Sequence, residues 1–126
     1  MGCIRVACKF SGEIDKNPEW MARRTRPDFL IHVPGLAGEA GGNLVTMEVK
    51  PLRRTSPIRL ANDVDKLRMF TSQGHYFLGV LLIYDHGGGE LPPGKSAQLQ
   101  ELIRGREGKI VLAWHRGPGS EIKIVP

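Results

Sequence analysis

The sequence is poor in cysteine, and this shortage argues against a disulfide-stabilised or zinc-binding protein. Its two cysteines, Cys3 and Cys8, lie five positions apart, so a shared strand would place them on opposite faces. That arrangement disfavours a disulfide, and two cysteines cannot complete a zinc site by themselves. We therefore expect reduced thiols, as in a cytoplasmic protein.

The sequence also lacks a long apolar run. No stretch approaches the roughly 20 residues that cross a bilayer, and the first residues lack the basic-then-apolar pattern of a secretory signal. We expect no membrane partner and a cytoplasmic location. The chain has 126 residues, of which 40% are hydrophobic, enough for one core, so we take 1–126 as a single domain.

The charge is unbalanced toward the basic side. There are 18 Lys and Arg against 13 Asp and Glu, a net charge of +5. This excess suits a polyanionic partner, although charge alone fits an ordinary basic protein equally well. Basic residues lie close in sequence to two candidate site residues, Asp28 and Glu48, and this distribution favours nucleic acid as the partner. The arginines that we expect to contact it are Arg23, Arg24, Arg26, Arg53 and Arg54.

Glycine and proline divide the chain into short elements. We predict strands over 3–10, 29–33, 44–49, 76–84, 110–114 and 121–125, and helices over 60–72 and 96–104. We predict loops over 11–25 and 34–43, and Asn62 or Asp63 as the cap of the first helix. The long apolar run at 76–84 predicts a strand covered on both faces. The order of elements indicates a mixed α/β (α+β) fold with helices packed on a central sheet.

The strand over 44–49 carries chemically different faces. Alternation places Glu48 and Lys50 on one face and three apolar residues on the other, which we expect in the core. These apolar residues are Val45, Met47 and Val49. Asp28 stands at the start of the preceding strand, and an antiparallel hairpin brings that start beside the end of the next strand. We therefore expect Asp28 close to Glu48.

Two neighbouring carboxylates repel each other and require a cation between them. Their hard oxygen ligands suit Mg²⁺ or Mn²⁺, which could polarise a phosphodiester and activate a water molecule. Lys50, on the face of Glu48, could orient that water or stabilise charge on the phosphate.

Residues 26–32 (Arg-Pro-Asp-Phe-Leu-Ile-His) and 43–50 (Asn-Leu-Val-Thr-Met-Glu-Val-Lys) together resemble the signature of the PD-(D/E)XK, or restriction-endonuclease-like, nucleases. The resemblance covers about residues 23–84. It implies a central mixed β-sheet flanked by helices, and Mg²⁺- or Mn²⁺-dependent cleavage of nucleic acid, with DNA the expected substrate. Asp28 and Glu48 would bind the metal, together with the backbone carbonyl of Val49, and Lys50 would assist catalysis.

Two further features follow from the resemblance. Asp63 and Lys66 lie on the helix where several of these families place an auxiliary polar residue. A helix cap and a solvated i,i+3 pair is the alternative interpretation of these two residues. The family core also begins with a helix, whereas this chain begins with a predicted strand. Either the leading helix is missing, or a gene boundary has removed it, or the protein is a degenerate relative of the family. A module this small is compatible with a homodimer.

Two alternatives stay open. The first is a catalytically inactive nucleic-acid-binding or interaction module on the same fold, which needs only the basic surface. The second is a nucleotide-binding protein, because Gly89–Ser96 fits the bare pattern G-x-x-x-x-G-K-S after an apolar strand and before a helix. Against it, two prolines in this loop have no N–H to offer a phosphate.

Overall fold

The computed structural model describes residues 5–7 (backbone only), 27–33, 35, 42–85, 87, 89–104 and 109–126. In this part of the chain six strands form one sheet in the order β1-β2-β3-β4-β5-β6. The strands are β1 (Arg5–Ala7), β2 (Phe29–His32), β3 (Asn43–Pro51), β4 (Leu78–Tyr84), β5 (Ile110–His115) and β6 (Lys123–Val125). The helices are η2 (Leu52–Arg54), α2 (Pro57–Ser72) and α3 (Pro93–Ile103).

The sheet changes character at β3. Strands β1, β2 and β3 are antiparallel, β3, β4 and β5 are parallel, and β6 returns antiparallel to β5. The predicted mixed α/β fold and the antiparallel pairing of β2 with β3 are therefore confirmed. The predicted loop over 11–25 and the arginines Arg23, Arg24 and Arg26 lie outside the described residues.

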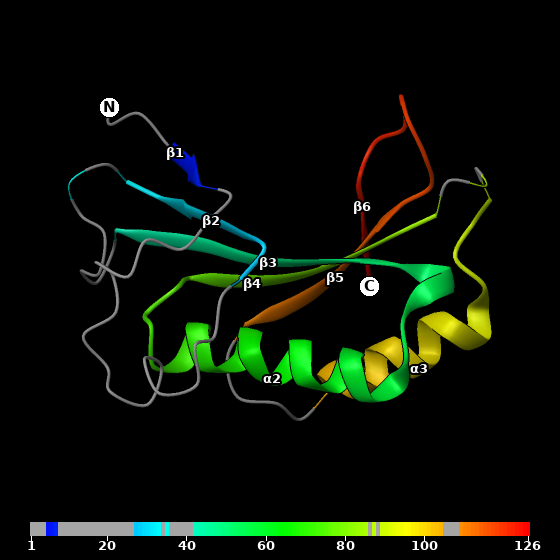
Figure 1. The fold of residues 1–126 in the computed structure, drawn as a ribbon, viewed down its shortest axis with the longest axis horizontal. Coiled ribbons are helices and arrows are strands. Elements are labelled where there is room, and N and C mark those ends of the chain that lie inside the picture. The colour runs from blue at the N-terminus through cyan, green and yellow to red at the C-terminus, as the bar shows by residue number, and fades with distance from the viewer. Residues whose placement is uncertain are drawn as a thin grey trace.

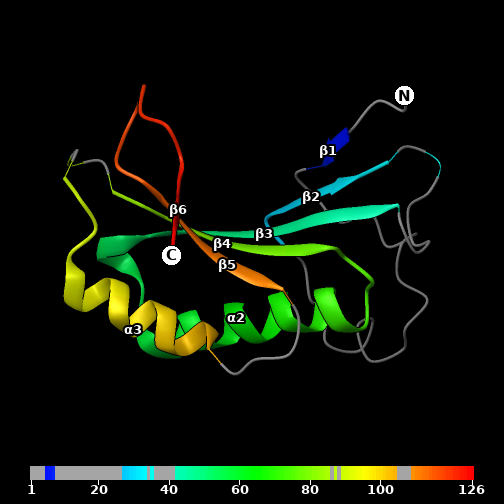
Figure 2. The same ribbon diagram turned by 180° about the vertical axis from the view of Figure 1, so that it is seen from behind.

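The two α-helices, α2 and α3, lie on the same face of the sheet (Figures 1 and 2). Helix α2 connects β3 to β4 and α3 connects β4 to β5, so both crossovers step in the same direction along the sheet. Right-handed crossovers in one direction place their helices on one face. The two helices therefore cover one face of β4, where Leu81 and Ile83 are buried, while on the other face Val80 is buried and Leu82 is half-buried.

The main core lies between this helical face and the parallel strands. The predicted stripe of Leu60, Val64 and Leu67 on α2 is buried, as expected from its helical spacing. It packs with buried residues of β4, β5 and α3, which are Leu81, Ile83, Leu99, Leu112 and Trp114. No helix in the described part of the chain has the length and apolar character that crossing a membrane requires.

Helix α2 begins earlier than predicted. Its N-cap is Ser56, whose hydroxyl accepts a hydrogen bond from the Arg59 N–H at 3.3 Å, and Pro57 occupies the first helical position. The prediction that Asn62 or Asp63 caps the helix is therefore wrong. The serine-proline pair before the apolar stripe is the signal that marks the true start.

The prediction for the faces of β3 is also wrong. Thr46 and Glu48 are fully buried, whereas Val45, Met47 and Val49 are only half-buried. The polar face of β3 is the one beneath α2, because Glu48 and Lys50 both reach side chains of that helix. Apolar character alone did not identify the covered face.

Glycine permits the close contact of α2 with β4. A Cβ at Gly79 would lie 3.2 Å from Thr71 Cγ2 and 3.4 Å from Leu67 Cβ. The helix therefore lies against the strand backbone, and its polar residues come within reach of β3.

The connection after α2 contains a residue with left-handed backbone geometry, His75, which has φ 58°. The side-chain amide of Asn43 donates a hydrogen bond to the Gly74 carbonyl at 2.8 Å, and Phe77 N–H donates to the Asn43 carbonyl at 3.2 Å. These bonds tie this turn to the start of β3 and hold His75 in a conformation that favours glycine.

We predict that His75→Gly raises the free energy of unfolding by about 0.5 kcal/mol, since relief of the left-handed strain exceeds the added chain entropy. The matched change His75→Val should lower it by about 1 kcal/mol, because a β-branched residue tolerates positive φ poorly. Urea denaturation of the three proteins measures both effects. Equal stability of the glycine and valine variants would contradict this account.

Candidate functional site

Asp28 lies just before the first residue of β2, Phe29, where β3 extends beyond the paired part of the two strands. Its Oδ2 accepts a hydrogen bond from the Val49 N–H at 2.8 Å. The last pair of residues between the two strands is Phe29 with Met47, so Asp28 takes the place that a further β2 residue would occupy. The carboxylate of Asp28 therefore lies beside the segment that carries Glu48, as the hairpin argument predicted.

Glu48 is fully buried on the helical face of β3. Burial raises its pKa from 4.5 to about 7; the Lys66 ammonium opposes this increase, and the charges of Asp28 and Asp63 add to it. Among the described residues, Glu48 Oε2 has no hydrogen-bond or ion-pair partner, and Oε1 has an ion-pair partner only. Burying a carboxylate oxygen without a partner costs free energy, so Glu48 Oε2 is available to bind a cation or to accept a hydrogen bond.

Two lysines neutralise most of this acidic charge. Lys66 Nζ lies 3.0 Å from Glu48 Oε1 and 3.6 Å from Asp63 Oδ1, while Lys50 Nζ lies 3.4 Å from Asp63 Oδ2. Burial acts to lower the pKa of Lys66, but the nearby carboxylates, chiefly Glu48, raise it above its ordinary value, so this side chain stays charged. The alternative of a helix cap and a solvated pair for Asp63 and Lys66 is wrong, since Asp63 is only 6% exposed and Lys66 reaches under the sheet.

These residues form one cluster of alternating charge, which we call the carboxylate cluster. It contains three carboxylates and two ammonium groups, and therefore one net negative charge when all are ionised. Its members are Asp28, Glu48, Lys50, Asp63 and Lys66.

The backbone of Val49 completes the oxygen-rich side of the cluster. In an extended strand the N–H and C=O of one residue point the same way, so the Val49 carbonyl points toward the side on which Asp28 lies. In the described part of the chain, no three His, Cys, Asp or Glu side chains are arranged to hold a metal ion. Mg²⁺ commonly uses only one or two carboxylates with water and substrate oxygens, so two carboxylates and a carbonyl fit its chemistry.

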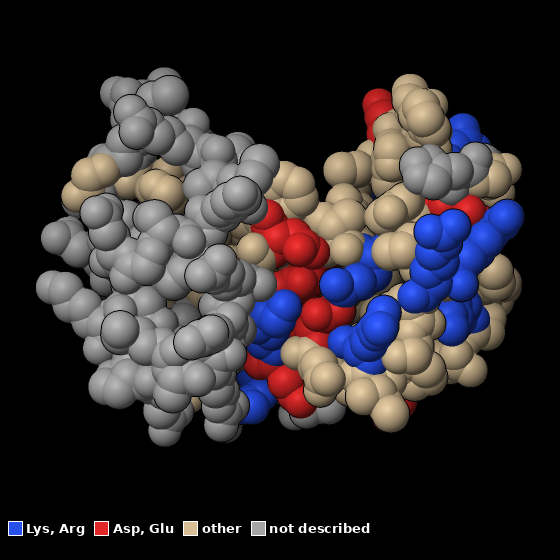
Figure 3. Space-filling model, in the orientation of Figure 1, with Lys and Arg blue, Asp and Glu red and all other residues tan. Residues whose placement is uncertain are grey.

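Charged side chains also gather on the surface above these elements (Figure 3). Asp and Glu side chains form a band through the middle of this face with Lys and Arg on both sides, and a second basic group lies over the end of β3. Arg53 and Arg54, expected to contact nucleic acid, are exposed in η2 directly after that strand. Asp85 was missed from sequence, although its place after a buried strand is a usable signal; it pairs with Arg53 at 3.4 Å.

The glycine-rich segment Gly89–Ser96 forms no phosphate cradle in the described residues. Helix α3 begins at Pro93, and Ser96 N–H is already donated to the Pro92 carbonyl at 2.9 Å. Lys95 lines the groove between α2 and α3. The geometry gives no support to nucleotide binding at Gly89–Ser96.

Comparisons with known proteins give a limited likeness. No protein family and no curated protein matches the sequence. A solved structure of SfsA from Pyrococcus furiosus in complex with Ca²⁺ is similar, with a TM-score of 0.40 and 18% identity over 79% of this chain and 47% of that chain. The chain thus spans about half the length of that protein.

The raised pKa of Glu48 makes stability depend on pH. Between about pH 4.5 and about pH 7 the folded state binds more protons than the unfolded chain, so wild-type stability falls as pH rises through this window. Glu48→Gln removes this linkage. We predict that the free energy of unfolding of the variant, minus that of wild type, rises by up to about 3 kcal/mol from about pH 5 to about pH 8.

Denaturant titrations at several pH values measure this difference. Glu101→Gln is a suitable control, because Glu101 is an exposed carboxylate on α3 with only a surface partner, Arg104. A difference for Glu48→Gln that is as flat with pH as that of the control would contradict the burial argument.

Proposed function

We propose that this chain is a metal-dependent nuclease-like domain of 126 residues that hydrolyses phosphodiester bonds of nucleic acid, with DNA the expected substrate. The observation that carries the proposal is the buried Glu48 carboxylate, whose Oε2 has no partner among the described residues, beside the carboxylate of Asp28. A purely structural ion pair would be expected to satisfy both oxygens of a buried acid.

The donor set fits Mg²⁺ or Mn²⁺. Asp28, Glu48 and the Val49 carbonyl supply hard oxygens, and the net negative charge of the carboxylate cluster favours a cation. A metal held there would polarise the phosphodiester and lower the pKa of a bound water. We propose these three residues as the metal ligands. Metal binding would distinguish this site from a purely structural cluster of ion pairs at the edge of the sheet.

The remaining residues of the cluster act on the substrate and on one another. Lys50 extends from the same face as Glu48, so its ammonium group stabilises charge that develops on the phosphate and orients the attacking water. Asp63 forms ion pairs with Lys50 at 3.4 Å and with Lys66 at 3.6 Å. It is therefore a positioning residue for the catalytic Lys50 and for the auxiliary Lys66. Lys66 keeps Glu48 in place when the second oxygen is engaged.

The basic residues support nucleic acid as the substrate. Arg53 and Arg54 follow the catalytic strand directly, and together with Arg23, Arg24 and Arg26 they would grip phosphate groups. We propose that the domain acts in the cytoplasm, and its small size is compatible with a homodimer.

Cleavage assays test this function. With Mg²⁺ or Mn²⁺ we expect cutting of single-stranded, duplex or branched DNA, and a loss on the order of 100-fold or more for Asp28→Asn and Lys50→Met. Glu101→Gln, a change of similar size on the α3 surface, should leave the rate unchanged. Cutting that persists in both cluster variants would show that it comes from another site or a contaminant.

Metal binding can be tested without turnover. Calorimetry with Mn²⁺ should show a site in wild type that Glu48→Ala loses and Glu101→Ala keeps, because only the first change removes a proposed ligand. Wild-type protein that binds no divalent ion would overturn the nuclease proposal.

A second candidate is a non-catalytic nucleic-acid-binding module, and the ion pair between Lys66 and Glu48 favours it. An ammonium group already occupies one side of the buried carboxylate, as expected where a cation is replaced permanently by a side chain. This candidate predicts DNA binding that is equal with chelator and with Mg²⁺, no cleavage, and unchanged affinity in Asp28→Asn. Metal-dependent cleavage would exclude it.

A further inference from the structure

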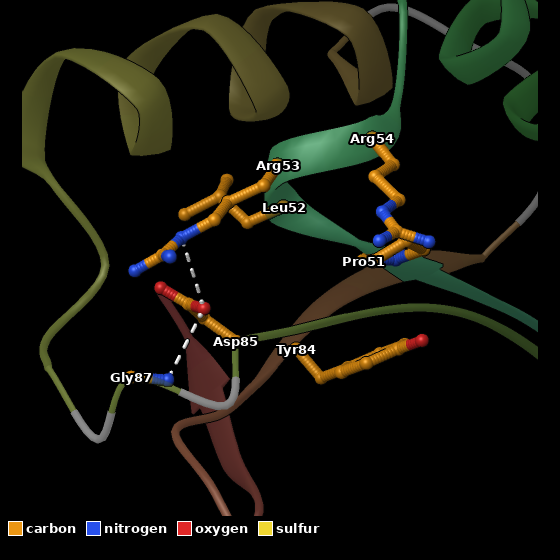
Figure 4. Close-up of a pocket in the computed structure, with 7 residues that line it drawn as sticks. All are labelled: Pro51, Leu52, Arg53, Arg54, Tyr84, Asp85 and Gly87. Carbon is orange, nitrogen blue, oxygen red and sulfur yellow. Dashed lines mark hydrogen bonds and ion pairs between the residues drawn. The ribbon is translucent and has the colours of Figure 1, made fainter.

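A pocket of about 500 Å³ opens at the carboxyl ends of β3 and β4 (Figure 4). It is separate from the carboxylate cluster. Pro51 and Tyr84 are paired in register, one position beyond Lys50 and Ile83, which point toward the helices. Strand alternation therefore directs Pro51 and Tyr84 to the opposite face of the sheet.

One wall of the pocket contains an ion pair between Arg53 and Asp85. Arg53 Nε lies 3.4 Å from Asp85 Oδ1, and the same oxygen accepts the Gly87 N–H at 3.2 Å. The Asp85 side chain is only 17% exposed, so this carboxylate is a fixed element of the wall. A Cβ at Gly87 would lie 3.0 Å from the Arg53 guanidinium, so a larger residue there requires the Arg53 side chain to shift.

The other wall combines a cation with an aromatic ring. Figure 4 shows the guanidinium of Arg54 and the ring of Tyr84 on the side of the pocket away from Arg53 and Asp85. No carboxylate among the described residues pairs with Arg54. Two guanidinium groups thus face one carboxylate, and the pocket carries one net positive charge.

We infer that this pocket binds a nucleoside phosphate, with the phosphate on Arg54 and the base on the ring of Tyr84. An Arg side chain suits phosphate oxygens, and an aromatic ring stacks any base. Apolar surface from Pro51 and Leu52 distinguishes the pocket from a site for inorganic anions, and its volume lies within the range of small-molecule sites.

The inference rests on the proposed function for the origin of its ligand, which is one unit of the strand that is cut at the carboxylate cluster. Pro51 lies three positions after Glu48 along β3, which is about 10 Å of extended chain. That length corresponds to about three nucleotides along one strand of a duplex. The pocket therefore holds a nucleotide a few positions from the scissile bond, on the other side of the sheet end.

Binding to this pocket needs no divalent ion, so it can be measured independently of catalysis. The experiment uses the full chain as Glu48→Gln in chelator, with a short fluorescent deoxyadenosine oligonucleotide and with free deoxyadenosine 5′-monophosphate as competitor. We expect Arg54→Gln and Tyr84→Leu each to weaken oligonucleotide binding roughly tenfold. Tyr84→Phe, which keeps the ring, should retain binding, and circular dichroism checks the fold of each variant.

Arg104→Gln is the matched control, because it removes an exposed arginine at the end of α3 that, among the described residues, pairs with the surface residue Glu101. Loss of binding in this variant equal to that in Arg54→Gln would reveal diffuse electrostatic attraction and overturn the pocket. Wild-type affinity in both Arg54→Gln and Tyr84→Leu would overturn it too, as would no binding of either probe. Competition by the free nucleotide shows that an isolated nucleoside phosphate suffices, whereas binding of the oligonucleotide alone assigns the pocket to a strand.

The outcome is separable from the proposed catalysis. Pocket binding without any cleavage would leave this inference standing and remove the nuclease. Cleavage that depends on Asp28, with no effect of Arg54→Gln or Tyr84→Leu on affinity, would support the nuclease and overturn the pocket inference.

Discussion

The carboxylate of Glu48, enclosed between β3 and α2, constrains the side chains that pair with it and the orientation of α2 on the sheet. A buried charge is tolerated only with a partner close at hand, and removal of that partner leaves a large uncompensated cost. Lys66 provides the partner at 3.0 Å, and Asp63, one helical turn earlier, holds both Lys66 and Lys50. The rotation of α2 about its axis is fixed by this requirement as well as by its apolar stripe. A helix packed only through leucine and valine could rotate slightly without penalty, whereas one that must also satisfy Glu48 cannot.

The change from antiparallel to parallel pairing at β3 gives this buried acid its surroundings. On one side β2 begins only at Phe29, so the edge of β3 beyond Met47 receives the side chain of Asp28 in place of another strand residue. On the other side β4 runs parallel, so both strands end together and their following loops meet. Arg53 and Asp85, which are 32 positions apart, form an ion pair for this reason. One strand therefore serves the carboxylate cluster along its edge and the pocket at its end.

Much of this arrangement could be predicted from sequence, because hairpin geometry and strand alternation are local rules. The proximity of Asp28 to Glu48 and the shared face of Glu48 and Lys50 follow from them directly. The covered face of β3 could not be predicted, because burial depends on where α2 packs, which is decided by the handedness of a crossover and not by the composition of the strand. The same holds for Asp63 and Lys66. As an i,i+3 pair they look like an ordinary surface pair, and only the position of α2 across the sheet turns them inward.

Lys66 is the residue on which the distinction between enzyme and binding module depends. Its ammonium group occupies Glu48 Oε1, while Oε2 has no partner among the described residues. A divalent ion held as proposed, by Glu48 Oε2, Asp28 and the Val49 carbonyl, would leave Lys66 in place, and the cluster's net negative charge would then be replaced by a positive one that attracts phosphate. If the ion instead requires both oxygens of Glu48, it must displace a lysine whose own pKa is raised by the carboxylates that it contacts. The first arrangement keeps Lys66 as a permanent support for a working site. The second makes Lys66 a competitor of the metal, and the same five side chains then form a stable structural cluster on a nucleic-acid-binding surface.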